Sequence, residues 1–231
     1  MKYSIFFGFL LVLLMQKNTA FSQTPTDQSP TVRQQYWVTV SLVKPIKKYI
    51  LGAEQGIGLS QNSWAMKNLP ATYTQLSMDY KPLIYFWEIG LAYRYGISAD
   101  ENFVSHRFDF NWSNDAEIKL SKKKKLVLNN RVRYSQYLPR FGKPQEALIR
   151  DALTIHYRKK DRPWEYFLGA ELFYSLQYDF KDFSRYRVGF GAIYNQKFNK
   201  RLKLAYLFQQ DINTSKPRLT HIINIDYRLK W

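Results

Sequence analysis

Residues Trp164 to Phe180, with the sequence WEYFLGAELFYSLQYDF, decide the fold. The nine even-numbered positions of this stretch are all apolar: Trp164, Tyr166, Leu168, Ala170, Leu172, Tyr174, Leu176, Tyr178 and Phe180. Its odd-numbered positions include Glu165, Gly169, Glu171, Ser175, Gln177 and Asp179. A helix would scatter the apolar residues around its circumference, whereas a β-strand places them all on one face. The stretch therefore predicts one long amphipathic strand.

The same period of two recurs along most of the chain, and turn-forming residues separate the repeats. Tyr85 to Tyr95, Phe108 to Leu120 and Tyr186 to Phe208 show it clearly, and no segment has a helical period. We predict strands at 36–43, 48–59, 71–80, 84–96, 103–120, 126–138, 147–158, 164–180, 184–198, 202–211 and 219–231. Their short connections indicate an antiparallel up-and-down barrel. Bacterial single-chain membrane barrels have even strand numbers, so we expect about twelve strands, with ten as the alternative.

The placement of lysine separates a membrane barrel from a soluble one. A soluble strand carries charges along its solvent face, but here lysine is concentrated in turns such as Lys44–Lys48, Lys122–Lys125 and Lys159–Lys160. Several strands exceed the 9–11 residues or so that cross a bilayer. Tyrosine and tryptophan lie near the ends of the apolar faces, as in the girdles of membrane barrels. These features favour a transmembrane barrel, and a soluble exported β-barrel remains the alternative.

The N-terminus predicts export. Lys2 precedes the apolar run Ile5 to Met15, and Ala20-Phe21-Ser22 places small residues where a signal peptidase cleaves. We expect a signal peptide over 1–22 that is removed near Ser22/Gln23, a polar linker over 23–34 and an outer-membrane barrel over 35–231. Cleavage lowers the formal charge from +17 by the two lysines Lys2 and Lys17. The predicted location is the outer membrane of a Gram-negative bacterium.

The last strand carries an assembly signal. Leu219, His221, Ile223 and Ile225 share a face with Tyr227, Leu229 and the terminal Trp231. An amphipathic strand that ends on an aromatic residue resembles the C-terminal signal of bacterial outer-membrane barrels, which implies the barrel assembly machinery as a partner. The C-terminus then lies in the periplasm, and the lysine-rich turns lie on the same side.

Several short motifs extend this resemblance over most of the mature chain. They are His106-Arg107-Phe108, Arg131-Val132-Arg133-Tyr134, Glu171-Leu172-Phe173-Tyr174, Ser184-Arg185-Tyr186-Arg187-Val188-Gly189 and the hairpin around Asn199-Lys200-Arg201. In this order they resemble domain-of-unknown-function family 2490, a group of bacterial outer-membrane β-barrel proteins. The resemblance implies a single barrel and brings no catalytic residues.

The face opposite the aromatic one predicts a charged lumen. Glu171 is the expected partner of Arg150 and Arg187 on the flanking strands, because a carboxylate and a guanidinium pair well in a confined space. The predicted lumen charge cluster is Glu171, Arg150, Arg187, Arg131, Arg133, Arg107, Glu88 and Arg94. This cluster either forms an ion-pair lattice that fills a narrow barrel or lines a pore that selects solutes by charge.

Other functional classes find little support. The chain has no cysteine, and no metal-ligand spacing, phosphate loop or nucleotide fingerprint occurs, so we expect no cofactor or metal. The dispersed lysines argue against nucleic acid and suggest contact with anionic outer-membrane lipids. His106 and His221 are expected to face lipid near the outer rim and His156 the lumen, which leaves no convergent catalytic triad. We predict a small porin-like channel or a structural barrel without enzymatic activity. An outer-leaflet lipid enzyme that uses His106 or His221 with Ser105 or Ser215 is a further alternative.

Overall fold

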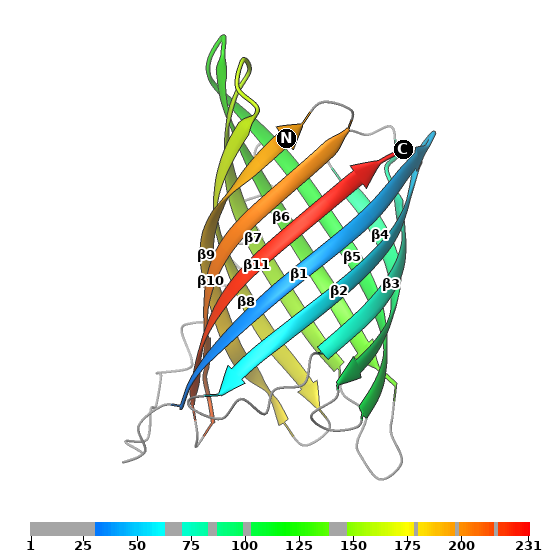
Figure 1. The fold of residues 1–231 in the computed structure, drawn as a ribbon, viewed down its shortest axis with the longest axis vertical. Helices are drawn as coiled ribbons and strands as arrows, with labels where there is room; N and C mark the ends of the chain where they lie inside the picture. Colours follow the sequence, from blue (N-terminus) through cyan, green and yellow to red (C-terminus); the bar gives the residue numbers. More distant parts are fainter. Residues whose placement is uncertain are drawn as a thin grey trace.

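The computed structural model describes residues 31–62, 71–82, 87–98, 103–138, 147–177, 180–196, 199–214 and 217–231. They form eleven strands: β1 (Thr31–Ile46), β2 (Tyr49–Asn62), β3 (Ala71–Tyr80), β4 (Trp87–Ser98), β5 (Phe103–Ser121), β6 (Lys124–Tyr137), β7 (Ala147–Lys159), β8 (Trp164–Gln177), β9 (Phe180–Gln196), β10 (Lys200–Asp211) and β11 (Arg218–Lys230) (Figure 1). None of these ranges contains a helix with the length and apolarity to cross a membrane. The predicted signal peptide lies outside the described residues.

The strands close into one barrel. Each strand pairs with its sequence neighbour in antiparallel orientation, and β1 closes the barrel against β11. This closing pair is parallel and runs from Thr31 opposite Arg218 to Val43 opposite Lys230. The sequence therefore predicts the all-β antiparallel barrel correctly. The described strands number eleven rather than twelve or ten, and this odd number makes the first and last strands run in the same direction.

Among the described strands only β3 has both of its predicted ends, and three of the differences change the element to which residues belong. β1 begins at Thr31, so residues 31–34 belong to the barrel and not to the predicted linker, because they pair with both β11 and β2. The predicted strand 164–180 is shorter, since Phe180 already belongs to β9. The turn predicted at 181–184 is absorbed into β9, where a register shift opposite Phe173 and Tyr174 accommodates one extra residue.

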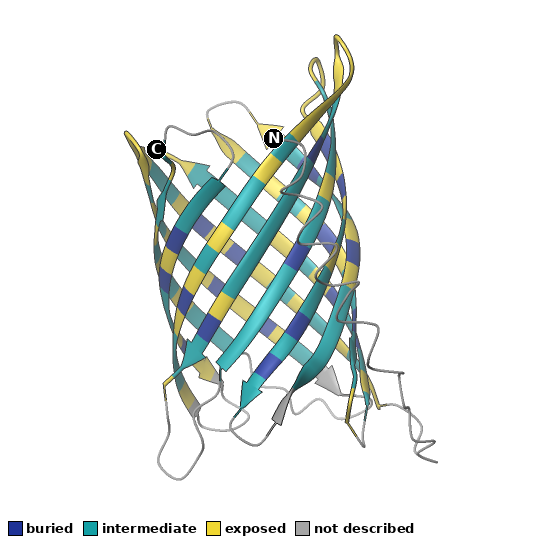
Figure 2. Ribbon diagram, turned by 180° about the vertical axis from the view of Figure 1, so that it is seen from behind, coloured by how far each residue is buried: buried dark blue, intermediate teal, exposed yellow. Residues whose placement is uncertain are grey.

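The outer surface of the barrel is apolar. Exposed and less exposed residues alternate along the strands (Figure 2), which is the pattern of period two seen in the sequence. Large apolar side chains are the exposed ones, among them Leu168 at 61%, Phe190 at 59% and Leu204 at 54%. Their neighbours Phe167 and Ile193 are buried on the inner face. A soluble barrel would require the opposite arrangement, with the apolar stripe inside.

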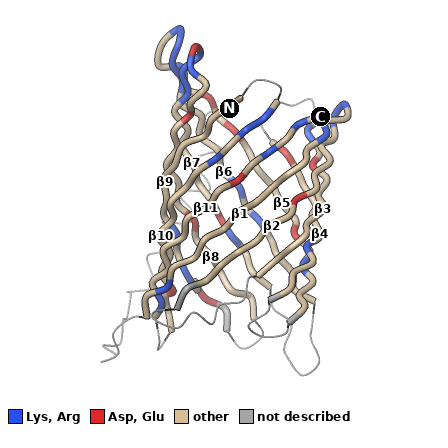
Figure 3. Tube along the Cα trace, viewed as in Figure 1, with Lys and Arg blue, Asp and Glu red and all other residues tan. Residues whose placement is uncertain are grey.

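The barrel has two ends that differ in chemistry. The turn end, at the top of Figure 1, carries the β1–β2, β5–β6 and β7–β8 turns together with the C-terminus, and the loop end lies opposite. Lysine and arginine gather on the hairpin tips of the turn end (Figure 3). Aromatic pairs also lie there on the outer surface, with ring centroids 4.8 Å apart for Trp164 and Tyr194 and 5.3 Å apart for Tyr49 and Tyr80.

Glycines on the inner face let large side chains lie flat against the wall. A Cβ on Gly191 would lie 2.7 Å from the ring of Phe167, and one on Gly56 would lie 2.1 Å from the ring of Tyr73. Only glycine permits this close approach. The two rings consequently fill the barrel interior from β8 and β3 without pushing the adjacent strands apart.

Candidate functional site: the barrel lumen

All eight residues of the predicted charge cluster lie on the inner face. Their strand positions alternate with the exposed apolar residues and share a face with buried Asp109, Ser135, Ala152 and Phe173. The structure brings seven of them into ion pairs or hydrogen-bond networks and leaves Arg131 outside these networks. Whether a residue of the cluster is paired therefore depends on which residues lie next to it on the neighbouring strands.

Glu171 of β8 is the centre of one network. Register places Arg187 of β9 directly opposite Glu171. On β7, Arg150 lies two residues from Ala152, which is the residue opposite Glu171. Both guanidinium groups donate to the Glu171 carboxylate, Arg187 at 3.0 Å. Arg187 also donates to the Oε1 atom of Gln209 at 2.6 Å and 3.2 Å, so its planar fork is held from two strands. The three charged side chains are 18–21% exposed, which makes this a largely buried ion triad.

Asp109 of β5 is the centre of a second network. Its carboxylate is almost fully buried and accepts hydrogen bonds from Arg107 at 2.8 Å and from the Ser135 hydroxyl at 2.6 Å. Arg133 approaches the same carboxylate at 3.7 Å and donates to Asn111 at 2.7 Å. One carboxylate thus lies near two guanidinium groups, and the neutral Asn111 side chain accepts a further hydrogen bond from Arg133.

A third network surrounds Arg94 of β4. Its guanidinium donates twice to Gln75, at 2.9 Å and 2.7 Å, and lies 3.8 Å above the ring of Tyr73. Tyr73 donates in turn to Glu54 at 2.7 Å, and Glu54 lies 3.6 Å from Arg94. Glu88 of the predicted cluster is separate from all three networks, since it pairs with Lys81 at 2.7 Å near the turn end.

The side of the lumen formed by β8, β9 and β10 is partly filled by apolar side chains. Phe167, Ile193 and Ala205 form a buried cluster on the inner face, and Leu207 packs against it. The ammonium group of Lys203 lies 4.6 Å from the centre of the Phe167 ring. This side is therefore occupied by packed side chains rather than by open volume.

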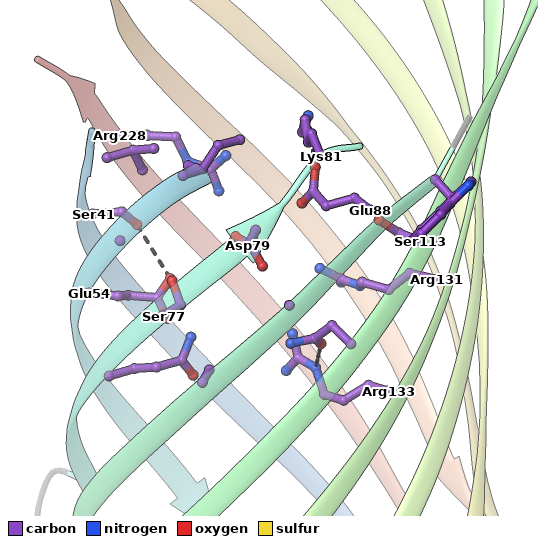
Figure 4. Close-up of a pocket in the computed structure, with 18 of the residues that line it drawn as sticks. Ser41, Glu54, Ser77, Asp79, Lys81, Glu88, Ser113, Arg131, Arg133 and Arg228 are labelled. Carbon is purple, nitrogen blue, oxygen red and sulfur yellow. Dashed lines mark hydrogen bonds and ion pairs between the residues drawn. The ribbon is translucent and has the colours of Figure 1, made fainter. Parts of the chain in front are cut away.

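A cavity of about 650 Å³ occupies the other side of the lumen and extends to the turn end. Small residues line much of its wall on β2 to β5: Gly52, Ser77, Gly90, Ala92 and Ser113. We call this cavity, with Asp79, Arg131 and Arg228 on its wall, the lumen chamber. These three charged side chains come from β3, β6 and β11, and Figure 4 shows them in the close-up of the chamber. The chamber is open because its wall residues have little side-chain volume.

The charges around the chamber differ from those of the three networks. Among the described residues, none of the three charged side chains Asp79, Arg131 and Arg228 on the chamber wall makes a hydrogen bond or an ion pair with another side chain. Register explains this for Arg131, which has Ser113 on one neighbouring strand and Ala152 on the other. The chamber carries a surplus of positive charge, because its lining has six cationic side chains and four anionic ones: Lys47, Lys48, Lys81, Arg131, Arg133 and Arg228 against Glu54, Asp79, Glu88 and Asp115.

Three further cationic residues face the lumen although the predicted cluster does not include them: Arg201, Lys203 and Arg228. The signal was available, because each occupies the parity opposite to an outward apolar residue. Arg228, for example, lies between Tyr227 and Leu229 on β11. The absence of partners could not be predicted from that alternation, since it depends on which residue lies opposite across each strand pair.

The histidines lie apart from one another. His106 faces outward and shares a 2.7 Å hydrogen bond with Tyr93, and His221 does the same with Tyr206 at 2.6 Å. His156 faces inward near the turn end, where it lies 2.5 Å from Glu165. In the described ranges no histidine hydrogen-bonds a serine. Ser105 donates instead to the Gly96 carbonyl at 3.4 Å, and Ser215 lies outside the described residues.

The C-terminal residues extend the closing seam. Tyr227, Leu229 and Trp231 alternate with inward-facing Asp226 and Arg228, and Trp231 is 68% exposed. The Trp231 amide donates to the Val43 carbonyl at 3.1 Å, while the Lys44 ammonium lies 3.8 Å over its ring. The terminal aromatic residue is thus attached to both sides of the β1–β11 seam.

Comparison with known proteins adds nothing to the barrel fold described above. No family model matches the sequence, so the resemblance to domain-of-unknown-function family 2490 stays a prediction. No curated protein matches it either. Among solved structures, the chain is similar to the beta domain of the Bordetella autotransporter BrkA, with 10% sequence identity and a TM-score of 0.45. The similarity covers 80% of this chain and 82% of that one, and at this identity it assigns neither family nor activity.

Proposed function

We propose that the chain is an integral β-barrel of the outer membrane and acts as a small porin-like channel that favours anions. The observation that carries the proposal is the sidedness of the closed barrel, with Leu168, Phe190 and Leu204 exposed outside and the charge networks inside. Such an exterior is stable in acyl chains and costly in water. The surplus of arginine and lysine around the lumen chamber provides the preference for anions.

A closed structural barrel is the second candidate. The packed cluster of Phe167, Ile193 and Leu207 and the ion triad at Glu171 both narrow the lumen. A barrel of this size can be filled by its own side chains. In that case the networks would stiffen the wall, and the protein would contribute to the envelope without transport.

Conductance in a planar lipid bilayer tests the proposal. Under a tenfold potassium chloride gradient, we expect small single-channel steps whose reversal potential shows that chloride is more permeable than potassium. Arg131→Gln should reduce this preference, because it removes one cation from the chamber wall. Lys160→Gln removes the same charge from a hairpin tip and serves as the matched control. The absence of conductance at every voltage would instead support the structural barrel.

The proposed membrane contacts follow from the turn end. The β5–β6 and β7–β8 hairpins project above the rim (Figures 1 and 3). They carry Lys122, Lys124 and Lys160, and Lys123 pairs with Asp161 at 3.0 Å. Lys124 and Lys159 lie opposite each other across β6 and β7, an arrangement of like charges that disfavours folding. Anionic headgroups of the adjacent leaflet would relieve that repulsion. We include these lipids, and the assembly machinery at Trp231, as partners in the proposal.

A further inference from the structure

The lumen separates its charged residues into two groups. Glu171, Asp109, Arg94 and the side chains that contact them have partners at hydrogen-bond or ion-pair distance, whereas the neighbouring Arg185 has only the Phe173 ring, 5.4 Å from its guanidinium carbon. Around the lumen chamber, by contrast, the described residues Arg131 and Arg228 have none. Folding alone gains nothing from leaving guanidinium groups without acceptors next to a cavity. The arrangement therefore points to an acceptor that comes from outside the chain.

We propose that the lumen chamber binds a small anionic solute that carries a phosphate or carboxylate group, with Arg131 and Arg228 as its anchors. This inference deepens the proposed function and rests on it, because it names the class of solute that the lumen takes. Guanidinium groups suit both ligands, since their planar donors match two oxygens of a carboxylate or phosphate at once.

Burial strengthens the argument at Arg228. Its Nε atom is inaccessible to solvent and has no hydrogen-bond partner among the described residues. The Nε atoms of Arg107 and Arg150 are also unpartnered, but those two guanidinium groups pair with a carboxylate through another nitrogen, which Arg228 does not. Its strand neighbours are Arg201 on β10 and Ser41 on β1, and neither is an anion. A buried donor without an acceptor costs free energy, and an anion beside it would recover that cost.

The size and the entrance of the chamber favour a small solute. Its volume of about 650 Å³ falls within the range of about 300–1,000 Å³ that small-molecule sites occupy. Lys47, Lys48 and Lys81 line its turn-end part, where Lys81 is partly neutralised by Glu88. The two unpaired lysines would attract anions toward the chamber from that end.

Asp79 provides a second test of the proposed site, because it is a carboxylate on the same chamber wall. It lies on β3 with Ile50 and Gly90 as its strand neighbours, and it makes no hydrogen bond or ion pair among the described residues. Its negative charge opposes an anion held by Arg131. Removing that charge should consequently strengthen anion binding, an effect opposite to that of removing either arginine.

Calorimetric titration of the refolded full-length barrel in detergent, at low salt, tests the site. Inorganic phosphate and succinate are the two probes, and the one that binds identifies the preferred group. We expect saturable binding that weakens by about tenfold or more in Arg131→Gln and in Arg228→Gln, as for the loss of a hydrogen-bonded charge. Asp79→Asn should bind more tightly than the wild type. Lys200→Gln, which removes an exposed charge from the β9–β10 hairpin, should bind unchanged.

The outcomes separate this inference from the proposed function. The absence of saturable binding for both probes, or wild-type binding by both arginine variants, would overturn the site even if the barrel conducts ions. A barrel that does not conduct but binds a probe saturably, with weaker binding in both arginine variants and tighter binding in Asp79→Asn, is a separate outcome. That result would support the site and reject only the channel. Heat-dependent gel mobility and circular dichroism identify variants that fail to fold. In that case Arg131→Lys, which keeps the charge but loses the planar fork, provides the substitute and should also weaken binding.

Discussion

Replacing Glu171 with glutamine should destabilise the barrel more than the same change at an exposed carboxylate such as Glu117. Glu171 is the shared acceptor of Arg150 and Arg187, and the side chains of the triad are only 18–21% exposed. Glutamine has nearly the same shape but no charge, so it leaves two guanidinium groups near each other without a counter-ion. The variant therefore isolates electrostatics from packing.

The expected magnitude follows from the burial of the triad. Removing one partner of a fully buried ion pair costs about 3–5 kcal/mol. The triad is partly accessible from the lumen, and Gln209 still accepts from Arg187, so we expect a smaller loss of about 2–3 kcal/mol. Glu117→Gln is the matched control, because Glu117 pairs with Lys125 at 2.7 Å and is 48% exposed. An exposed pair contributes about 0–1 kcal/mol.

Urea unfolding of the barrel in lipid vesicles, followed by tryptophan fluorescence, measures both free energies of unfolding. The double variant Glu171→Gln with Arg150→Gln should recover part of the loss, because it removes one of the two uncompensated charges. Equal free energies for Glu171→Gln and Glu117→Gln would refute the reasoning. Such a result would mean that lumen water screens the triad as effectively as bulk water screens the hairpin tip.

Three further predictions concern packing, assembly and lipid contact. Gly191→Ala should lower the free energy of unfolding in urea by about 1–3 kcal/mol, because the added Cβ would lie 2.7 Å from the Phe167 ring and 2.2 Å from the Leu204 carbonyl oxygen. Gly169→Ala is the control and should lower it less, because the nearest atom to its Cβ would be 3.2 Å away. Trp231→Ser should slow insertion by the assembly machinery in reconstituted membranes but leave urea stability nearly unchanged, and equal insertion rates would contradict the assembly role. Replacing Lys122, Lys124 and Lys160 with glutamine should weaken binding of detergent-solubilised barrel to phosphatidylglycerol vesicles relative to phosphatidylcholine vesicles, and an unchanged ratio would exclude these lysines as headgroup contacts.

The period of two in the sequence predicts most of the fold because a barrel wall has only two faces. All eleven predicted strands correspond to observed ones, and the prediction of 71–80 matches β3 at both ends. The parallel β1–β11 closure was missed because the even strand numbers of bacterial barrels favour a twelfth strand, whereas eleven strands joined by hairpins place the first and the last in the same direction. The extra residue in β9 was missed because the apolar pattern of Trp164 to Phe180 continues into the next strand.

The candidate site could be predicted only in part. The sequence indicates which charges face the lumen and, through adjacent strands, that Glu171 lies near Arg150 and Arg187. It groups Arg131 with them, whereas the structure places Arg131 between Ser113 and Ala152. That difference depends on register between strands, which an alternating pattern leaves open. The distinction between paired and unpaired charges, on which the proposed anion site rests, therefore cannot be predicted from the alternation alone.

The most direct test of the account uses the absence of cysteine from the chain, which allows one spin label at a time. Leu76 is 59% exposed on the outer face, and the adjacent Ser77 lines the lumen chamber. Leu76→Cys and Ser77→Cys, each carrying a nitroxide in reconstituted vesicles, report collisions with oxygen, which concentrates in acyl chains, and with a water-soluble nickel chelate. The account predicts high oxygen and low nickel accessibility at residue 76 and the reverse order at residue 77. Preferential nickel accessibility at residue 76, with residue 77 shielded from it, would contradict a membrane-spanning barrel with a polar lumen.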